Sequence, residues 1–171
     1  MNIEIRKPKF DEWEKFKALR LESLKEFPTA FASSYDEQID RPDDEWKQFI
    51  MSSEEGKSSI MVCAYDGDQM VGSVAAYWSN REKVSHVCNL GGMFVRAKYQ
   101  NQGVGRKLVE KLFKLVVEMD RFRKIQLNVV EDNLHALNFY KKMGFIEVGV
   151  SRDGLNVDGH YHNLVNMDKF L

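Results

Sequence analysis

Residues 100–105, Gln-Asn-Gln-Gly-Val-Gly, form a glycine-rich segment between a strand-like apolar run at 90–95 and a helical run at 106–119. A glycine-rich turn that leads from a strand into a helix directs several backbone N–H groups towards one point, where the helix dipole adds partial positive charge. A phosphate group suits such a point. The segment therefore predicts a strand–turn–helix unit with a phosphate-bearing ligand at the start of the helix.

Two common phosphate-binding loops do not match this segment. A P-loop requires Gly-Lys-Ser or Gly-Lys-Thr at the start of the helix, whereas Gly105 is followed by Arg106 and Lys107. A dinucleotide-binding turn requires a third glycine where Leu108 stands, near the first strand of a parallel array. ATP, GTP and NAD are therefore disfavoured.

The composition is that of one folded domain, which we assign to residues 1–171 because 43% hydrophobic content can bury one sizeable core. The formal net charge of −1 provides no general attraction for nucleic acid or an anionic membrane. No apolar run approaches the ~20 residues that span a bilayer, so we expect a cytoplasmic protein. Cys63 and Cys88 lie in apolar strand-like runs, which favours packing over redox or metal chemistry.

Apolar spacing predicts an α+β fold, with a mixed, mostly antiparallel sheet of about seven strands flanked by about four helices. Asp11 and Glu14 have capping-box spacing, Asp66-Gly67-Asp68 indicates a hairpin, and Gly144 closes a helix. The expected strands are residues 2–7, 58–65, 70–78, 84–95, 124–130, 145–150 and 161–170, and the expected helices begin near residues 11, 43, 103 and 133.

Three segments together resemble the GNAT superfamily of N-acetyltransferases. They are Met-Phe-Val at 93–95, Tyr-Gln-Asn-Gln-Gly-Val-Gly at 99–105, and Asn-Leu-His-Ala-Leu-Asn-Phe-Tyr-Lys-Lys-Met-Gly-Phe at 133–145. The second is similar to that family's Q/R-x-x-G-x-G/A acyl-CoA signature, and the third to its N-x-x-A-x-x-x-Y-x-x-x-G-F helix. The expected element order agrees with the family from about residue 2 to residue 170.

This resemblance implies that acetyl-CoA lies in a cleft where strands 90–95 and 125–130 splay apart. The pantetheine arm would pair with the backbone of residues 93–95 like an added strand, and the N–H groups of residues 102–106 would hold the pyrophosphate. Gly91-Gly92 fits a bulge that redirects the strand, or simply relieves crowding. The cofactor-binding residues expected on this basis are Met93, Phe94, Val95, Gln100, Asn101, Gln102, Gly103, Val104, Gly105, Arg106, Asn133 and Asn138.

The resemblance assigns the catalytic acid to Tyr140, whose phenol would protonate the departing CoA thiolate. The alternative is an ordinary core aromatic, because Tyr140 shares a helical face with other apolar residues. For the proton acceptor, Glu131 follows a central strand and His86 lies on the predicted strand before the cofactor residues. Either could act through water, or could be a solvated carboxylate and a satisfied strand histidine.

Two histidines near the C-terminal end are candidates for a metal site or for the acceptor pocket. His160 and His162 share a strand face near Asp158, but no third ligand is specified, so no metal is expected. The two histidines could instead line the acceptor pocket. The opposite wall is expected from Phe31, Ser33, Ser34 and Tyr35.

The expected function is direct transfer of acetyl from acetyl-CoA to a primary amine, most simply of a small molecule. A protein N-terminus or lysine is the alternative acceptor. A hypothesis of another class is a non-catalytic module that senses acyl-CoA or docks a partner. A monomer and a homodimer are both compatible with the sequence, because the last strand is β-rich.

Overall fold

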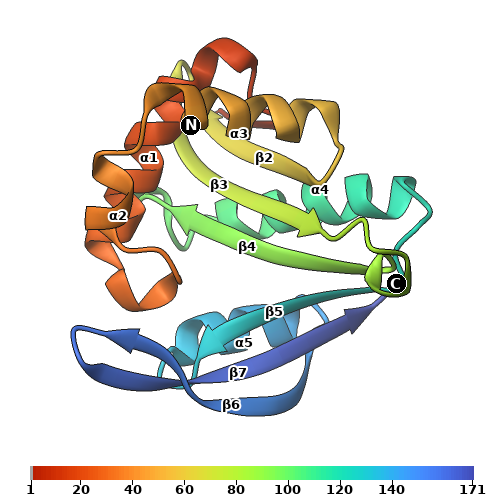
Figure 1. Cartoon of the computed structure of the whole chain (residues 1–171). Coiled ribbons are helices and arrows are strands. Elements are labelled where there is room, and N and C mark those ends of the chain that lie inside the picture. The colour runs from red at the N-terminus through yellow and green to blue at the C-terminus, as the bar shows by residue number, and fades with distance from the viewer. Residues whose placement is uncertain (1) are drawn as a thin grey trace.

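The computed structural model describes residues 2–171 and contains one seven-stranded sheet with helices on both faces (Figure 1). The strand order is β1-β2-β3-β4-β5-β7-β6, and only β4 and β5 run parallel. This confirms the predicted α+β class, and the first and last strands along the chain belong to the same sheet. The strands are β1 (Ile3–Arg6), β2 (Ser59–Asp66), β3 (Gln69–Trp78), β4 (Val87–Val95), β5 (Lys124–Val130), β6 (Ile146–Val157) and β7 (His160–Phe170).

Two clusters of buried side chains cover opposite faces of the sheet, because successive strand residues point in opposite directions. In β2, Val62 and Ala64 join the cluster beneath α4, whereas Cys63 and Tyr65 join the cluster beneath α1 and α3. The helices are α1 (Trp13–Glu26), α2 (Tyr35–Ile39), α3 (Asp43–Glu55), α4 (Val104–Glu118) and α5 (Leu134–Lys142). Among residues 2–171, none of these helices combines the length and apolar character needed to cross a membrane.

Several turn predictions are confirmed. β2 and β3 form a hairpin in which Asp66 pairs with Gln69, and Gly67 has a φ of +59°. Gly92 has a φ of +62° at an irregularity in the β3–β4 pairing, which confirms the expected bulge. Asn133 caps α5 by accepting the Ala136 N–H at 3.0 Å.

Some boundaries differ from prediction. β4 begins at residue 87 rather than 84, because Glu82–Val84 form a 3-10 turn, and β6 continues to residue 157 through its pairing with β7. The short helix α2 was not expected; Ser34 and Glu37 cap its start reciprocally, so five helices replace the expected four. The capping box at Asp11 and Glu14 is wrong, because α1 follows the 3-10 turn Phe10–Glu12.

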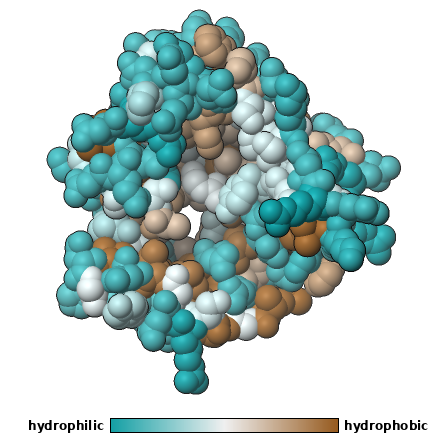
Figure 2. Space-filling model, viewed as in Figure 1, coloured by the Kyte–Doolittle hydropathy of each residue, from teal (hydrophilic) through white to brown (hydrophobic). Residues whose placement is uncertain are grey.

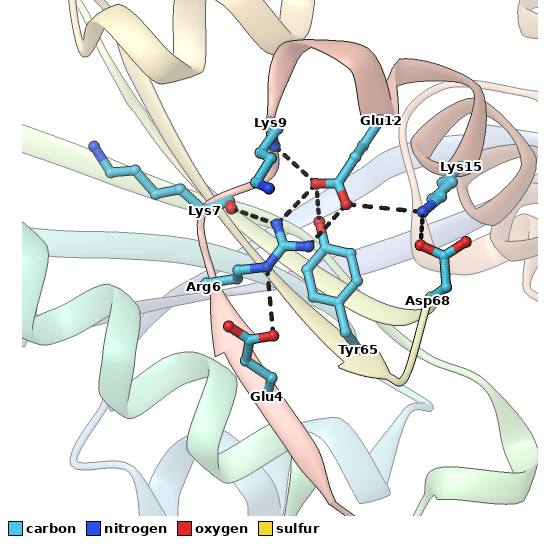
Figure 3. Close-up of polar contacts among 8 residues, drawn as sticks. All are labelled: Glu4, Arg6, Lys7, Lys9, Glu12, Lys15, Tyr65 and Asp68. Carbon is cyan, nitrogen blue, oxygen red and sulfur yellow. Dashed lines mark hydrogen bonds and ion pairs between the residues drawn. The ribbon is translucent and has the colours of Figure 1, made fainter.

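The polar cluster in Figure 3 fastens this first turn to the sheet. Both Glu12 carboxylate oxygens accept hydrogen bonds from the Arg6 guanidinium at 2.8 Å, and Oε2 also accepts from the Lys9 N–H at 2.8 Å and the Tyr65 hydroxyl at 2.9 Å. The guanidinium lies 3.7 Å from the centre of the Tyr65 ring. The cluster therefore joins β1, the following turn and β2, on the part of the sheet remote from β5.

We predict that Glu12→Gln lowers the free energy of unfolding at pH 7 by about 3 kcal/mol, because it leaves the Arg6 charge without its buried partner. Hydrogen bonding from Arg6 lowers the pKa of Glu12 from 4.5 to about 2. Since the folded-state pKa is depressed, this stabilisation is complete above about pH 4.5 and is lost as the pH falls towards 2. Urea unfolding at pH 7 and near pH 3 should show the two proteins converging in acid.

Glu4→Gln is the matched control, because Glu4 pairs with the same arginine at 3.6 Å but its side chain is 64% exposed. Its effect should stay below about 1 kcal/mol. An effect of Glu12→Gln no larger than that of Glu4→Gln would contradict the account of this cluster.

Candidate active site

The parallel strands β4 and β5 pair only at their first residues, between residues 87–89 and 124–126. Beyond Asn89 the two strands diverge, as Figure 1 shows. β3 occupies the other edge of β4, and β7 occupies the other edge of β5. The backbone N–H and C=O groups that face the gap therefore lack strand partners and can bind a ligand.

A cleft of about 920 Å³ follows this gap. It runs from the glycine-rich turn before α4 to the 3-10 turn η2 (Pro28–Ala30). The face drawn in Figure 2 is hollowed near its centre, where the gap lies in Figure 1. Ten of the predicted cofactor-binding residues line the cleft: Met93, Phe94, Val95, Gln100, Asn101, Gly103, Gly105, Arg106, Asn133 and Asn138.

At one end of the cleft, the first turn of α4 presents unpaired backbone donors. The Lys107 N–H donates to the Gly103 carbonyl at 3.0 Å, so the N–H groups of residues 104–106 precede the first hydrogen bond of the helix. Gly103 has a φ of +78°, a conformation that favours glycine. These donors and the helix dipole fit a pyrophosphate, and the unpaired strand edges fit the amides of a pantetheine arm.

Two predicted cofactor residues do not line the cleft with their side chains. Gln102 is exposed and donates to the Lys98 carbonyl at 2.7 Å, and Val104 is buried in the core beneath α4. These two residues can therefore contribute to cofactor binding only through their backbone N–H groups. Gln100 does line the cleft, but its side-chain amide donates to the Val95 carbonyl at 2.8 Å and thereby ties the turn to β4.

Tyr140 of α5 reaches the cleft from the apolar core. Its side chain is only 7% exposed, and its ring packs edge-on against Phe139 and Phe145. Burial raises the pKa of the Tyr140 phenol above its ordinary value, so the group stays protonated at neutral pH. The core interpretation of the ring is confirmed, and the acid role of the protonated hydroxyl stays a prediction.

The structure does not bring the candidate bases beside Tyr140. Glu131 is exposed, lies outside the residues that line the cleft, and accepts a hydrogen bond from Asn163 Nδ2 at 2.8 Å. His86 is exposed in the turn before β4, at the paired end of the β4–β5 contact, so its placement on the strand was wrong. A base role for Glu131 stays a prediction and would require intervening water.

The other end of the cleft is formed by aromatic and small side chains around η2. Phe31 lines it as predicted, whereas Ser34 caps α2, and Ser33 and Tyr35 are not among the lining residues. His160 and His162 do not line it either, and residues 2–171 contain no cluster of His, Cys, Asp and Glu arranged to hold a metal. Sequence reasoning did not name Phe27 and Ala30 at this end of the cleft, nor the cleft-lining residues Asn128, His135 and Lys142.

Both cysteines are buried and free. Desolvation raises the pKa of Cys88 to about 12, and burial raises the pKa of Cys63 as well. The thiolate that a nucleophile requires is therefore disfavoured. This geometry supports the packing interpretation and direct transfer rather than an acetyl-cysteine route.

Comparison with known proteins agrees with this geometry. Residues 16–145 match the Acetyltransferase (GNAT) family. The chain is 30% identical to the L-amino acid N-acetyltransferase AaaT of Escherichia coli (strain K12) over 129 residues, which cover 72% of this chain and 78% of the relative.

Solved structures of low sequence identity share the fold. An acetyltransferase of the GNAT family from Streptococcus pneumoniae superposes with a TM-score of 0.90 at 23% identity, covering 99% of this chain and 100% of that one. YncA from Salmonella typhimurium, solved with its cofactor acetyl-CoA, has a TM-score of 0.86 at 13% identity, covering 100% and 95%.

The chain therefore belongs to the GNAT family of acetyltransferases. It is an acetyl-CoA-dependent N-acetyltransferase, and the splayed strands with the start of α4 fit acetyl-CoA as its acetyl donor.

Gly105→Ala should weaken acetyl-CoA binding modestly, because the added Cβ would lie 2.9 Å from Met93 Cε and would displace the flexible end of this cleft-lining side chain. Because Met93 Cε is the mobile end of an unbranched side chain, the cost should be near the lower end of the usual overpacking range, about 1 kcal/mol, which corresponds to roughly fivefold in affinity if it falls on the bound state. Calorimetric titration with acetyl-CoA measures the change. Gly149→Ala is the control, since its Cβ would meet nothing within 4 Å; equal affinities for the two variants would contradict the assigned site.

Proposed function

We propose that the protein transfers acetyl directly to the primary amine of a small molecule, with Tyr140 as the acid that protonates the leaving thiolate. The observation that supports this proposal is that Tyr140 lines the cleft along a gap whose two strand edges are unpaired. We further propose that the enzyme acts in the cytoplasm, as a monomer or a homodimer.

A small acceptor is favoured by the way η2 closes the cleft. This turn contacts β5 and β6 on one side of the gap, and Phe27, the residue before it, packs against Phe94 of β4 on the other side, with ring centroids 6.1 Å apart. Phe27 and Phe31 enclose the end of the cleft there, which leaves less room for an extended polypeptide than an open groove would. The E. coli relative is named for L-amino acids, which is in keeping with a small acceptor.

In this proposal, bound acetyl-CoA supplies an activated acetyl thioester. The amine nitrogen forms a bond to the acetyl carbonyl carbon, the carbon–sulfur bond breaks, and the electron pair leaves on sulfur. Tyr140 gives its proton to that sulfur and regains one from solvent, while the amine loses one proton to water. The products are the N-acetylated amine and the free thiol of CoA.

The residues of the site approach the gap from both faces of the sheet. Tyr140 clusters with Leu127 and Val129, which point to the face covered by α5. Asn128 lies between them in β5 and therefore points to the opposite face. The CoA thiolate can thus be protonated from the α5 face of the sheet, while the amine approaches the thioester from the opposite face.

Tyr140→Phe should lower turnover by roughly 100-fold or more, because general-acid catalysis contributes about 10²–10⁴. Acetyl-CoA affinity should be unchanged, since the ring and its packing remain. Tyr99→Phe is the control: Tyr99 is also buried, but its hydroxyl donates to Asp66 outside the cleft at 3.0 Å. If Tyr140→Phe turned over as fast as Tyr99→Phe, Tyr140 would not be the catalytic acid.

The proposed function itself is tested by thiol release from acetyl-CoA with a panel of amino-acid derivatives, alkyl amines, polyamines and peptides, against a blank without acceptor. We expect release that depends on a small amine. If only protein or long peptide substrates gave release, the acceptor class would be wrong. If acetyl-CoA bound but no amine in the panel were acetylated, the non-catalytic hypothesis would replace the proposal.

A further inference from the structure

One uncharged polar side chain, Asn128, lines the cleft on the face of the sheet opposite Tyr140. Asn128 of β5 lines the cleft and faces away from the α5 side of the sheet. Around it the lining is apolar or aromatic, with Phe27, Phe31 and Phe94. A single amide in such surroundings is suited to orient one polar group of a ligand.

The orientation of the Asn128 amide follows from its neighbours on the same face. Asn128 pairs with Asn166 in the β5–β7 register, and its Nδ2 donates to Asn166 Oδ1. Asn166 Nδ2 in turn donates to Ser151 Oγ at 3.1 Å. With its N–H end engaged, Asn128 has its carbonyl oxygen left as an acceptor, and an amine N–H is a matching donor.

The charges around the cleft exclude a carboxylate partner for the amine. Among the described residues, no Asp or Glu lines it; its charged side chains are the cations Arg106 and Lys142, and His135 is its one histidine. Asp168, which shares the Asn128 face of the β5–β7 pair, and Glu131, which follows the end of β5, are both engaged elsewhere. Asp168 accepts from Lys124, and Glu131 accepts from Asn163.

We infer that Asn128 accepts a hydrogen bond from the incoming amine, and that the enzyme therefore selects weakly basic α-amines over alkyl amines and polyamines. This inference rests on the proposed function. A neutral amide can orient an amine but cannot take its proton, so the amine has to arrive uncharged. A cationic cleft also disfavours a polycation.

The size of the selection follows from the amines themselves. At pH 7 an α-amine with a pKa near 8 is about 10% neutral, whereas an alkyl amine with a pKa near 10.4 is about 0.04% neutral. The difference is roughly 200-fold in reactive species. The preference should shrink as the pH rises and both amines become neutral.

The test compares phenylalaninamide with 2-phenylethylamine, which lacks the carboxamide that makes the amine of phenylalaninamide less basic; contacts to the carboxamide would give a ratio independent of pH, whereas basicity gives one that falls as the pH rises. For the wild-type enzyme, kcat/KM at pH 7 should favour phenylalaninamide by roughly 100-fold, and the ratio should fall steadily towards pH 10. Asn128→Asp introduces a carboxylate that can take the proton, and should reduce the ratio at pH 7 at least tenfold. Asn128→Leu should raise KM for the amine while acetyl-CoA affinity stays the same.

Asn89→Asp is the matched control, because Asn89 lies on the same face but in the paired part of β4, where it accepts from Gln126 Nε2 at 2.8 Å. It should leave the ratio unchanged. A wild-type preference for 2-phenylethylamine or spermidine at pH 7 would overturn the inference and leave the proposed function standing. Equal kcat/KM ratios of the two amines for Asn128→Asp and Asn89→Asp would also overturn the inference. The same holds if the pH profile of the wild-type enzyme contained an enzyme pKa that Glu131→Gln abolishes, because Glu131 would then be the base. Failure to acetylate any amine of the panel would overturn the proposed function as well.

Discussion

The early end of β4–β5 pairing is the constraint on which the rest of the structure depends. A parallel pair that continued to Val95 and Val130 would satisfy its backbone groups internally and would leave no site. By stopping after Asn89, the sheet retains a row of unpaired donors and acceptors in its interior. Each such group costs about 1–3 kcal/mol when it is buried without a partner. An amide-bearing ligand that supplies the missing hydrogen bonds is therefore bound favourably in the cleft.

Several features hold the two strands apart. The Asn89–Gln126 hydrogen bond closes the paired end, and the bulge at Gly92 turns β4 away beyond it. On one face, α4 and α5 pack against separate strands, so the core is continuous beneath the gap. On the other face, η2 contacts β5 and β6 and limits how far the gap extends. The site is therefore a product of ordinary packing rather than of local strain at a single residue.

Much of this arrangement could be predicted because its signals are local. The glycine-rich turn, the Asn133 cap and the Gly67 hairpin each depend on residues a few positions apart, and each lies where the sequence indicates. The Ser34–Glu37 capping box has a local signal too, and α2 could have been found from it. The role of Asn128 could not, because it depends on the pairing of β5 with β7 and on the distant turn η2. Gln102 and Val104 show the same limit of local signals. The motif predicts the backbone conformation of the turn correctly, but tertiary packing determines that neither side chain points into the cleft.

The central claim, that the open edges of β4 and the start of α4 bind the donor, is tested most directly by amide hydrogen exchange with and without CoA. The account predicts slower exchange on CoA addition in peptides covering residues 91–95 and 102–107. Exchange in β1 and β2, which lie at the far edge of the sheet, should stay the same. Unchanged exchange in both cleft segments at saturating CoA, or protection confined to other parts of the chain, would contradict the account.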